Sequence, residues 1–305
     1  SALTKLSYIR HDPSFSNYST YYICTQDSKI AILKLMKELN GSELAGFIKE
    51  RQAKQVRALR QAWHIQPRLA IVTDTENPVI ETYMRLKQRY GADILIDVEI
   101  HRAEAGQVLG VINALNNRDD VQGIILQLPI SNPRQTEELL ESIRIDKDVD
   151  GLCRQTDFQA ATPTAINWLL AGYGINLKGK KIAIVGRGRL VGAPLEKMWL
   201  KSGIDATVFE KGDDLSQLIN YDVVVSATGV PGLITDQMVK TKAVVVDAGT
   251  SSEDGKIVGD VSDEVRLRED VLITPKKGGV GPLTVSALFD NLITACLKIA
   301  NQTKD

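Results

Sequence analysis

A short apolar run that ends in a glycine-rich turn constrains the fold of this chain more than any other stretch. Residues 181–185 read Lys-Ile-Ala-Ile-Val, and Gly186, Gly188 and Gly192 follow before a helical stretch at 195–200. Such a run is typical of a buried parallel strand. Glycines at a strand-to-helix turn let the backbone approach a pyrophosphate at the helix N-terminus. The spacing G-x-G-x-x-x-G is one residue longer than the common dinucleotide fingerprint, so an ordinary strand–turn–helix corner is the alternative.

Size and composition narrow the class of protein. The chain has 305 residues, enough for two domains, and its 43% hydrophobic and 25% charged residues are typical of a soluble globular protein. A net charge of -1 argues against nucleic-acid binding. We expect no membrane span, because no apolar run approaches the required length, and no secretory signal. Cys24, Cys153 and Cys296 lack metal-ligand spacing, which predicts no metal site and a reducing, cytoplasmic location.

Strand and helix patterns alternate along most of the chain, which predicts parallel sheets covered on both faces. We expect an N-terminal arm over 1–28, a catalytic α/β domain over 29–160, a Rossmann-type dinucleotide-binding domain over 161–284, and a helix over 285–305 that returns to the first domain. The fold class is therefore α/β, with two three-layer domains and a cleft between them. The expected strands are 67–73, 93–100, 122–129, 181–185, 206–210, 222–227, 243–248 and 271–274. The expected helices are 31–63 with a break near Gly41, 79–90 stopped at Gly91, 107–116, 137–143, 163–173, 195–201, 215–219, 236–239 and 284–300.

A tyrosine and a lysine one helical turn apart are the first candidates for chemistry. Tyr83 and Lys87 are separated by four residues in the helix expected over 79–90, so they share a face. A lysine in a partly desolvated site has a lowered pKa and exchanges protons near neutral pH. The alternative is an ordinary solvated face of an amphipathic helix.

Polar residues at the end of a predicted strand and in the following loop form a second group. Gln127 ends a buried strand, where ligands of open α/β sheets bind, and its amide offers a donor and an acceptor. Asp148 and Asp150 flank Val149 in a loop that leads out of the first domain. A carboxylate there can accept two N–H bonds from a heterocycle. A solvated strand end and a simple turn with exposed charges are the alternatives.

The segment 274–284 is dense in glycine and ends in Thr284, a candidate helix N-cap. Such a segment places backbone groups near a flat ligand, and a plain flexible linker is the alternative. Asp290 and Asn291 follow on the helix and are expected to be structural.

Together these blocks resemble the bifunctional methylenetetrahydrofolate dehydrogenase/cyclohydrolase family, from about Leu35 to Ala300. Each block alone is weak, and their common order makes the resemblance specific. The blocks are Tyr83-x-x-x-Lys87, Gln127-Leu128-Pro129, Lys147-Asp148-Val149-Asp150-Gly151, Thr162-Pro163, Gly186 to Pro194, Gly229-x-Pro231-Gly232, Gly255-Lys256-x-Val258-Gly259-Asp260-Val261, and Gly278 to Thr284.

The resemblance implies oxidation of methylenetetrahydrofolate with NADP or NAD, followed by hydrolysis of methenyltetrahydrofolate to formyltetrahydrofolate. It implies that Lys87 is the cyclohydrolase lysine, with Tyr83 and Gln127 positioning the folate, and that Asp150 holds the pterin edge. The implied substrate residues also include Leu128, Pro129, Gly278, Gly279, Gly281 and Pro282. The implied cofactor residues are Gly186, Arg187, Gly188, Arg189, Val191, Gly192, Glu210, Thr228, Gly229, Thr250 and Thr284. The implied partners are tetrahydrofolate derivatives, including polyglutamylated forms, and a second copy of the chain through the sheet of the second domain.

The chain departs from the family pattern around the cofactor. Gly188 stands where the family usually has serine, and 210–213 reads Glu-Lys-Gly-Asp where a His-Ser or His-Arg pair is usual. Glu210 is placed to bond a ribose hydroxyl and repel a 2′-phosphate, which makes NAD plausible in place of NADP. Ile80 replaces a usual serine near the folate, and the lysines at 276–277 either meet a polyglutamate tail or are solvated. Two alternatives therefore stay open: a monofunctional dehydrogenase of the same fold, and a non-catalytic NAD(P)- or folate-binding regulator.

Overall fold

The structure, a computed structural model, describes residues 38–249, 251–253 and 256–302. The arm expected over 1–28, the first part of the helix expected over 31–63, and Thr250 lie outside the described residues.

The first sheet has three parallel strands in the order β2-β1-β3. They are β1 (Arg68–Thr73), β2 (Asp97–Arg102) and β3 (Gly123–Leu126). Successive residues of a strand point to opposite faces, so Leu69 and Ile71 pack on one side of the sheet and Ala70 and Val72 on the other. The covering helices are α2 (Gly41–Ala62), α3 (Pro78–Asp93), α4 (Val108–Asn116) and α5 (Thr136–Glu141), the last preceded by the 3₁₀ turn η1 (Pro133–Gln135).

The second sheet has five parallel strands in the order β10-β7-β6-β4-β5. They are β4 (Ile182–Val185), β5 (Thr207–Phe209), β6 (Val223–Ser226), β7 (Val244–Asp247) and β10 (Leu272–Ile273). The chain leaves β4 toward β5 and then returns to the other side of β4 as β6, so the carboxyl end of β4 is the switch point where ligands of such sheets bind. The flanking elements are α6 (Ala161–Gly172), α7 (Gly192–Lys201), η2 (Leu215–Asn220), η3 (Asp236–Met238) and α8 (Asp263–Leu267).

Both sheets carry apolar clusters on each face, which confirms the expected α/β class with three-layer units. The segments expected as helices over 215–219 and 236–239 are 3₁₀ turns. An antiparallel hairpin of β8 (Ser251–Glu253) and β9 (Lys256–Val258) was not expected.

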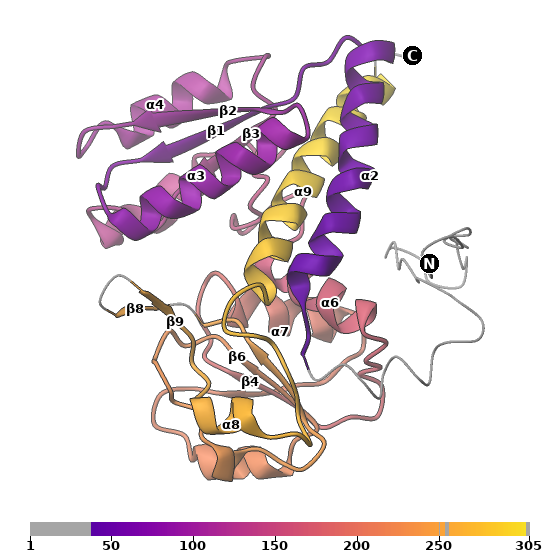
Figure 1. Ribbon diagram of the computed structural model, residues 1–305. Coiled ribbons are helices and arrows are strands. Elements are labelled where there is room, and N and C mark those ends of the chain that lie inside the picture. Colours follow the sequence, from indigo (N-terminus) through magenta and orange to yellow (C-terminus); the bar gives the residue numbers. More distant parts are fainter. Residues whose placement is uncertain (1–37, 250, 254–255, 303–305) are drawn as a thin grey trace.

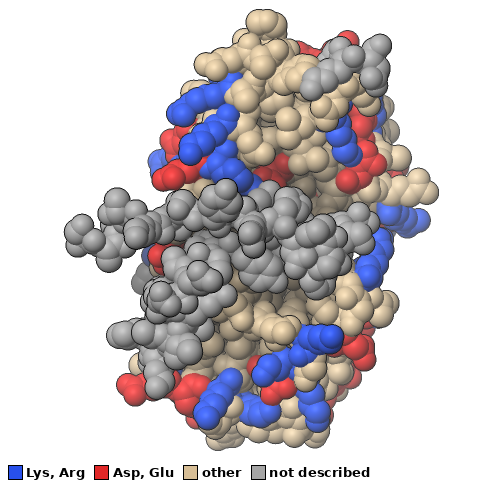
Figure 2. Space-filling model, turned by 90° about the vertical axis from the view of Figure 1, so that its right-hand side faces the viewer, with Lys and Arg blue, Asp and Glu red and all other residues tan. Residues whose placement is uncertain are grey.

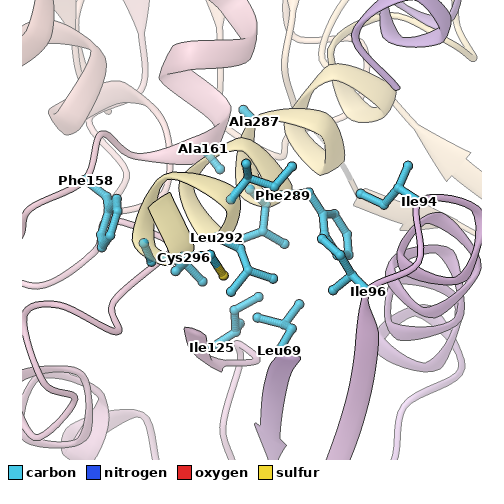
Figure 3. Close-up of a cluster of buried hydrophobic side chains, with 14 of the residues drawn as sticks. Leu69, Ile94, Ile96, Ile125, Phe158, Ala161, Ala287, Phe289, Leu292 and Cys296 are labelled. Atoms are coloured by element: carbon cyan, nitrogen blue, oxygen red, sulfur yellow. The ribbon is translucent and has the colours of Figure 1, made fainter. Parts of the chain in front are cut away.

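Two long helices connect the two units. α2 and α9 (Val280–Gln302) run side by side between them (Figure 1). The buried face of α9 places Phe289, Leu292 and Cys296 against Leu69 and Ile125 of the first sheet (Figure 3). The other end of the same helix contributes to the core of the second unit. The core of the first unit is therefore completed by the last helix of the chain.

The apolar character of α9 corrects one expectation. By length and composition α9 could cross a membrane, contrary to the expectation that no apolar run approaches that length. Within this helix, 56% of the most apolar 18-residue stretch is buried inside the protein. Its packing against α2 and α6 is that of a core helix.

Two helix ends lie elsewhere than the sequence predicts. Gly91 does not stop α3, which continues to Asp93. A Cβ at Gly91 would lie 2.6 Å from Cγ2 of Val98, so glycine is needed there for close helix–strand packing. Thr284 is not an N-cap, because α9 begins at Val280 and the Thr284 hydroxyl donates to the Val280 carbonyl at 3.3 Å.

Candidate active site

A lysine–glutamine pair lies at the carboxyl edge of the first sheet. The Nζ of Lys87, on α3, donates to Oε1 of Gln127, directly after β3, at 2.8 Å. The Gln127 amide nitrogen donates to the Leu128 carbonyl at 3.1 Å, which turns its oxygen toward the lysine. Both side chains are half-buried, so Lys87 does not lie on a fully solvated helix face.

Charge and burial act in opposite directions on Lys87. Burial lowers the pKa of Lys87 below its ordinary value, and the negative charge of Asp150 offsets part of that effect. Burial raises the pKa of Asp150, which the positive charge of Lys87 opposes and Asp148 reinforces. This arrangement favours an amine that gives and takes a proton more readily than an exposed lysine.

The two aspartates of the following loop have different surroundings. Asp148 is buried and accepts the backbone N–H groups of Gly151 at 3.2 Å and Cys153 at 3.0 Å, so it holds the loop together. Asp150 is less buried and interacts electrostatically with Lys87. The loop thus carries one structural carboxylate and one whose charge acts on the amine.

The remaining residues expected around the substrate lie in two places. Tyr83 is one turn before Lys87 on α3 and is half-buried, while Leu128 and Pro129 follow Gln127 directly. Gly278 and Gly279 pack against the start of α2: the Gly278 carbonyl accepts the Ser42 N–H at 2.9 Å, and a Cβ at Gly41 would collide with the Gly279 carbonyl. Gly281 and Pro282 are in the first turn of α9, with Gly281 exposed.

The turn after β4 is built as a cradle for a phosphate group. Gly186 has φ +94°, a backbone conformation that favours glycine. A Cβ at Gly192 would collide with the Gly186 carbonyl, so the turn closes on itself without side chains. Val191 precedes α7, whose first residue is Gly192, so the free N–H groups of a ten-residue helix begin at this turn. The residues present therefore fit a dinucleotide pyrophosphate.

Carboxylates neutralise both arginines of this turn. Arg187 donates from Nε to Glu196 at 3.0 Å and from Nη1 to Glu210 at 3.4 Å. Arg189 pairs with Glu137 of α5, which joins the turn to the first unit. Neither Glu196 nor Glu137 was identified from the sequence, because each pairing depends on how separate elements meet.

A buried carboxylate supports the loop after β6. Asp260 is fully buried and accepts the Ser226 hydroxyl and the Thr228 N–H, each at 2.7 Å. The Thr228 hydroxyl accepts the Val230 N–H at 3.1 Å, around Gly229 with φ +70°. Asp260 stands in one of the blocks that resemble the family, and its supporting role was not predicted from the sequence.

A second carboxylate continues this network. Asp247, at the end of β7, pairs with Arg266 and accepts the backbone N–H of Asp260 at 3.1 Å. Burial raises the pKa of Asp247. Thr284 is on α9, where its hydroxyl is 3.4 Å from that of Thr162 on α6. Among the described residues no group of three or more His, Cys, Asp or Glu is placed to hold a metal ion.

Comparison with known families accounts for both units. The catalytic-domain model of the tetrahydrofolate dehydrogenase/cyclohydrolase family matches residues 39–150, and its NAD(P)-binding-domain model matches residues 160–300. The chain belongs to the tetrahydrofolate dehydrogenase/cyclohydrolase family. A relative from Hydrogenobaculum, named bifunctional protein FolD, is 37% identical over 279 residues, covering 85% of this chain and 98% of the relative.

Solved structures of other family members have the same architecture. The bifunctional enzyme FolD from Campylobacter jejuni aligns with a TM-score of 0.81 and 33% identity, over 87% of this chain and 99% of that one. A methylenetetrahydrofolate dehydrogenase-cyclohydrolase from Trypanosoma brucei, solved with NADP and an inhibitor, aligns with a TM-score of 0.79 and 27% identity, over 85% and 97%. In this family member the Gly186–Gly192 turn therefore belongs to the NAD(P)-binding domain, and Lys87, Gln127 and Asp150 belong to the catalytic domain.

Proposed function

We propose that the chain oxidises methylenetetrahydrofolate to methenyltetrahydrofolate with NAD(P), and hydrolyses methenyltetrahydrofolate to formyltetrahydrofolate. One observation carries the proposal: the half-buried Lys87 amine is hydrogen-bonded to Gln127 and feels the charge of Asp150, in a chain that matches both domain models of this family. The nicotinamide, when bound, accepts the hydride of the first step. The chain's own residues hold and align the two flat rings.

The first step needs alignment rather than proton transfer. The glycine turn and the N-terminus of α7 fit the pyrophosphate, which fixes one end of the dinucleotide. The loop at Thr228 and Gly229, held by Asp260, and the hydroxyl of Thr284 border the position proposed for the nicotinamide. These residues, with Thr250, are proposed to orient the ring.

The second step needs a proton acceptor. Water adds to the cationic one-carbon bridge and loses one proton. The carbon–oxygen double bond then forms as a carbon–nitrogen bond of the bridge breaks, and the remaining proton of the water passes to the departing nitrogen. Lys87 is proposed to take the first proton, since burial keeps its pKa below the ordinary value and so raises the share of neutral amine. Gln127 orients the amine by accepting its hydrogen bond, and Tyr83 on the same helix face is proposed to pack beside the folate.

The folate site is proposed to combine residues of both domains. Asp150 offers a carboxylate to the amino-amidine edge of the pterin, and Leu128 and Pro129 border the ring. The glycine segment from Gly278 to Pro282 reaches the site from the second domain. Lys276 is paired with Asp263 at 2.6 Å, so Lys277 is the proposed contact for a polyglutamate tail.

The deciding experiment follows methenyltetrahydrofolate by its absorbance. Formation from methylenetetrahydrofolate with NAD or NADP, followed by decay faster than in buffer, is the expected result. Formation without accelerated decay would leave a monofunctional dehydrogenase, and binding of nucleotide or folate without any turnover would leave a regulator.

Three further features are proposed with the function. The chain is proposed to divide into domains at 160 and 284, and α9 starts four residues before the second of these positions, at Val280. A homodimer through β5 is supported by the position of this strand at the sheet edge, where Thr207 is exposed. Sedimentation equilibrium would test it.

A cytoplasmic location is supported by the buried, unpaired thiols of Cys153 and Cys296.

A further inference from the structure

The guanidinium of Arg187 is shared between two carboxylates of the nucleotide-binding unit. Its Nε and Nη2 donate to the two oxygens of Glu196 on α7, at 3.0 and 3.3 Å, and its Nη1 donates to Glu210 at 3.4 Å. Such a two-point pairing matches the planar geometry of arginine. The Arg187 N–H groups that could donate to a phosphate group therefore already donate to carboxylates.

The same edge of the sheet carries more negative than positive charge. Glu210 follows β5, and its backbone N–H donates to the Asp213 carboxylate at 2.7 Å. The acid at the end of the second strand of a dinucleotide fold bonds the ribose 2′-hydroxyl, whereas a nearby arginine accommodates a 2′-phosphate. Here the three carboxylates of Glu196, Glu210 and Asp213 outnumber two cations, Arg187 and Lys211. A 2′-phosphate would meet repulsion at this edge, and a hydroxyl would meet an acceptor.

The turn also lacks a side-chain hydroxyl at Gly188. A Cβ at Gly188 would come no closer than 3.9 Å to another atom, the Ala227 carbonyl oxygen. Gly188, unlike Gly186, is not among the residues with positive φ. The fold therefore leaves room for a hydroxyl at this position, and the chain does not provide one.

We propose that Glu196 and Glu210 make this site selective for NAD over NADP, Glu210 by bonding the ribose hydroxyl and Glu196 by holding Arg187 away from a 2′-phosphate. The inference rests on the proposed function. Glu196 is thus a specificity-determining residue that acts through Arg187.

The test measures equilibrium binding by titration calorimetry, separately for NAD and NADP. The proteins are the full-length wild type, Glu196→Gln, Glu210→Gln and Gly188→Ser. Asp157→Asn is the matched control, since Asp157 forms an exposed pair with Lys298 at 2.9 Å away from this turn. The wild type is expected to bind NAD roughly tenfold more tightly than NADP, as expected for one or two partly exposed charges.

The variants separate the two roles. Glu196→Gln should improve NADP binding about fivefold with NAD binding nearly unchanged, because it releases Arg187 without touching the ribose. Glu210→Gln should weaken NAD binding and improve NADP binding. Gly188→Ser should improve NADP binding alone, and Asp157→Asn should change neither.

Each other outcome overturns the inference. A wild type that binds NADP at least as tightly as NAD contradicts the selectivity. A Glu196→Gln variant whose ratio of the two affinities equals that of the wild type contradicts the role of Glu196. If the wild type binds neither nucleotide, the dehydrogenase half of the proposed function fails together with the inference; if it binds NADP better, that function stands and only the inference fails.

Discussion

The Nζ of Lys87 and the Oε1 of Gln127 are 2.8 Å apart, which ties the middle of α3 to the residue that follows β3. The amide can only accept through this oxygen, so the amine keeps one N–H directed at it in either protonation state. Its remaining hydrogen-bonding capacity is available to a substrate or to water. A hydrogen bond between side chains of a helix and a sheet edge thus sets the direction of the proposed proton acceptor.

Removal of the amine should separate the two reactions. We expect Lys87→Ala to lower the rate of methenyltetrahydrofolate hydrolysis by about two to four orders of magnitude, the usual range for a general base. Folate binding, measured by calorimetry, should change far less. Lys87→Arg is the matched variant, since its guanidinium keeps the charge and does not release a proton. Hydrolysis that persists in both variants would rule out Lys87 as the acceptor.

The charge of Asp150 should set the pH range of hydrolysis. Asp150 raises the pKa of Lys87 against the lowering effect of burial. Asp150→Asn removes that opposing charge, so the pKa of Lys87 should fall further and the amine should become neutral at lower pH. The rising limb of the rate–pH profile should therefore move to lower pH. Asp146→Asn is the control, because Asp146 is exposed and pairs with Arg144. Movement toward higher pH would contradict the assignment.

The glycine turn should matter for nucleotide binding and not for hydrolysis. A methyl group at Gly192 collides with the Gly186 carbonyl, so Gly192→Ala should open the turn and abolish binding of NAD and NADP. Gly188→Ala places the same methyl group in open space and should leave binding nearly intact. Calorimetry with both nucleotides, alongside hydrolysis of methenyltetrahydrofolate, measures the difference. Equal losses in the two variants would argue against the cradle.

The Asp260 carboxylate should stabilise the second unit. Asp260→Ala removes the acceptor for Ser226 and Thr228, and hydrogen bonds to a buried charged group contribute about 1.5–3 kcal/mol each. We expect the free energy of unfolding to fall by about 3 kcal/mol or more in urea denaturation. Asp213→Asn, which alters an exposed carboxylate of the same unit, should cost less than about 0.5 kcal/mol. Equal costs for the two would contradict the prediction.

Shortening a buried side chain in the middle of α9 should destabilise the whole protein. Phe289→Ala removes a fully buried ring that stacks on Tyr90 at a centroid distance of 5.0 Å. A large-to-small change of this kind costs about 3–5 kcal/mol. Thermal denaturation should show a lower transition temperature for the variant, with Leu267→Ala on the surface as a mild comparison. An unchanged transition would mean that α9 is not a core helix.

The strands were predictable because their apolar runs reflect burial on both faces. The runs at 67–73, 181–185 and 243–248 correspond to β1, β4 and β7 within one or two residues. The helix end expected at Gly91 was wrong, because a glycine required for contact with Val98 has the same local appearance as one that ends a helix.

The site was only partly predictable for a related reason. Lys87, Gln127 and Asp150 stand in recognisable blocks of sequence, and the structure joins Lys87 to Gln127 by a hydrogen bond. Their roles in catalysis and folate binding stay a prediction. Glu196, Glu137 and Asp247 stand in no such block, and their importance appears only when distant elements meet. The β8–β9 hairpin carries no strong alternation of apolar residues, so the local pattern gave no signal for it.

The position of α9 has a consequence for how the two halves can exist. The segment from Ala287 to Ala300 packs on one face of the first sheet and completes the core of the first unit. In the chain, nearly the whole second unit lies between this segment and the rest of the first unit. A fragment ending near residue 160 would lack α9, so Leu69, Ile125 and their apolar neighbours would be exposed to water. The first unit is therefore not an independent folding unit. During synthesis, its core can be completed only after the ribosome has made α9 near the end of the chain.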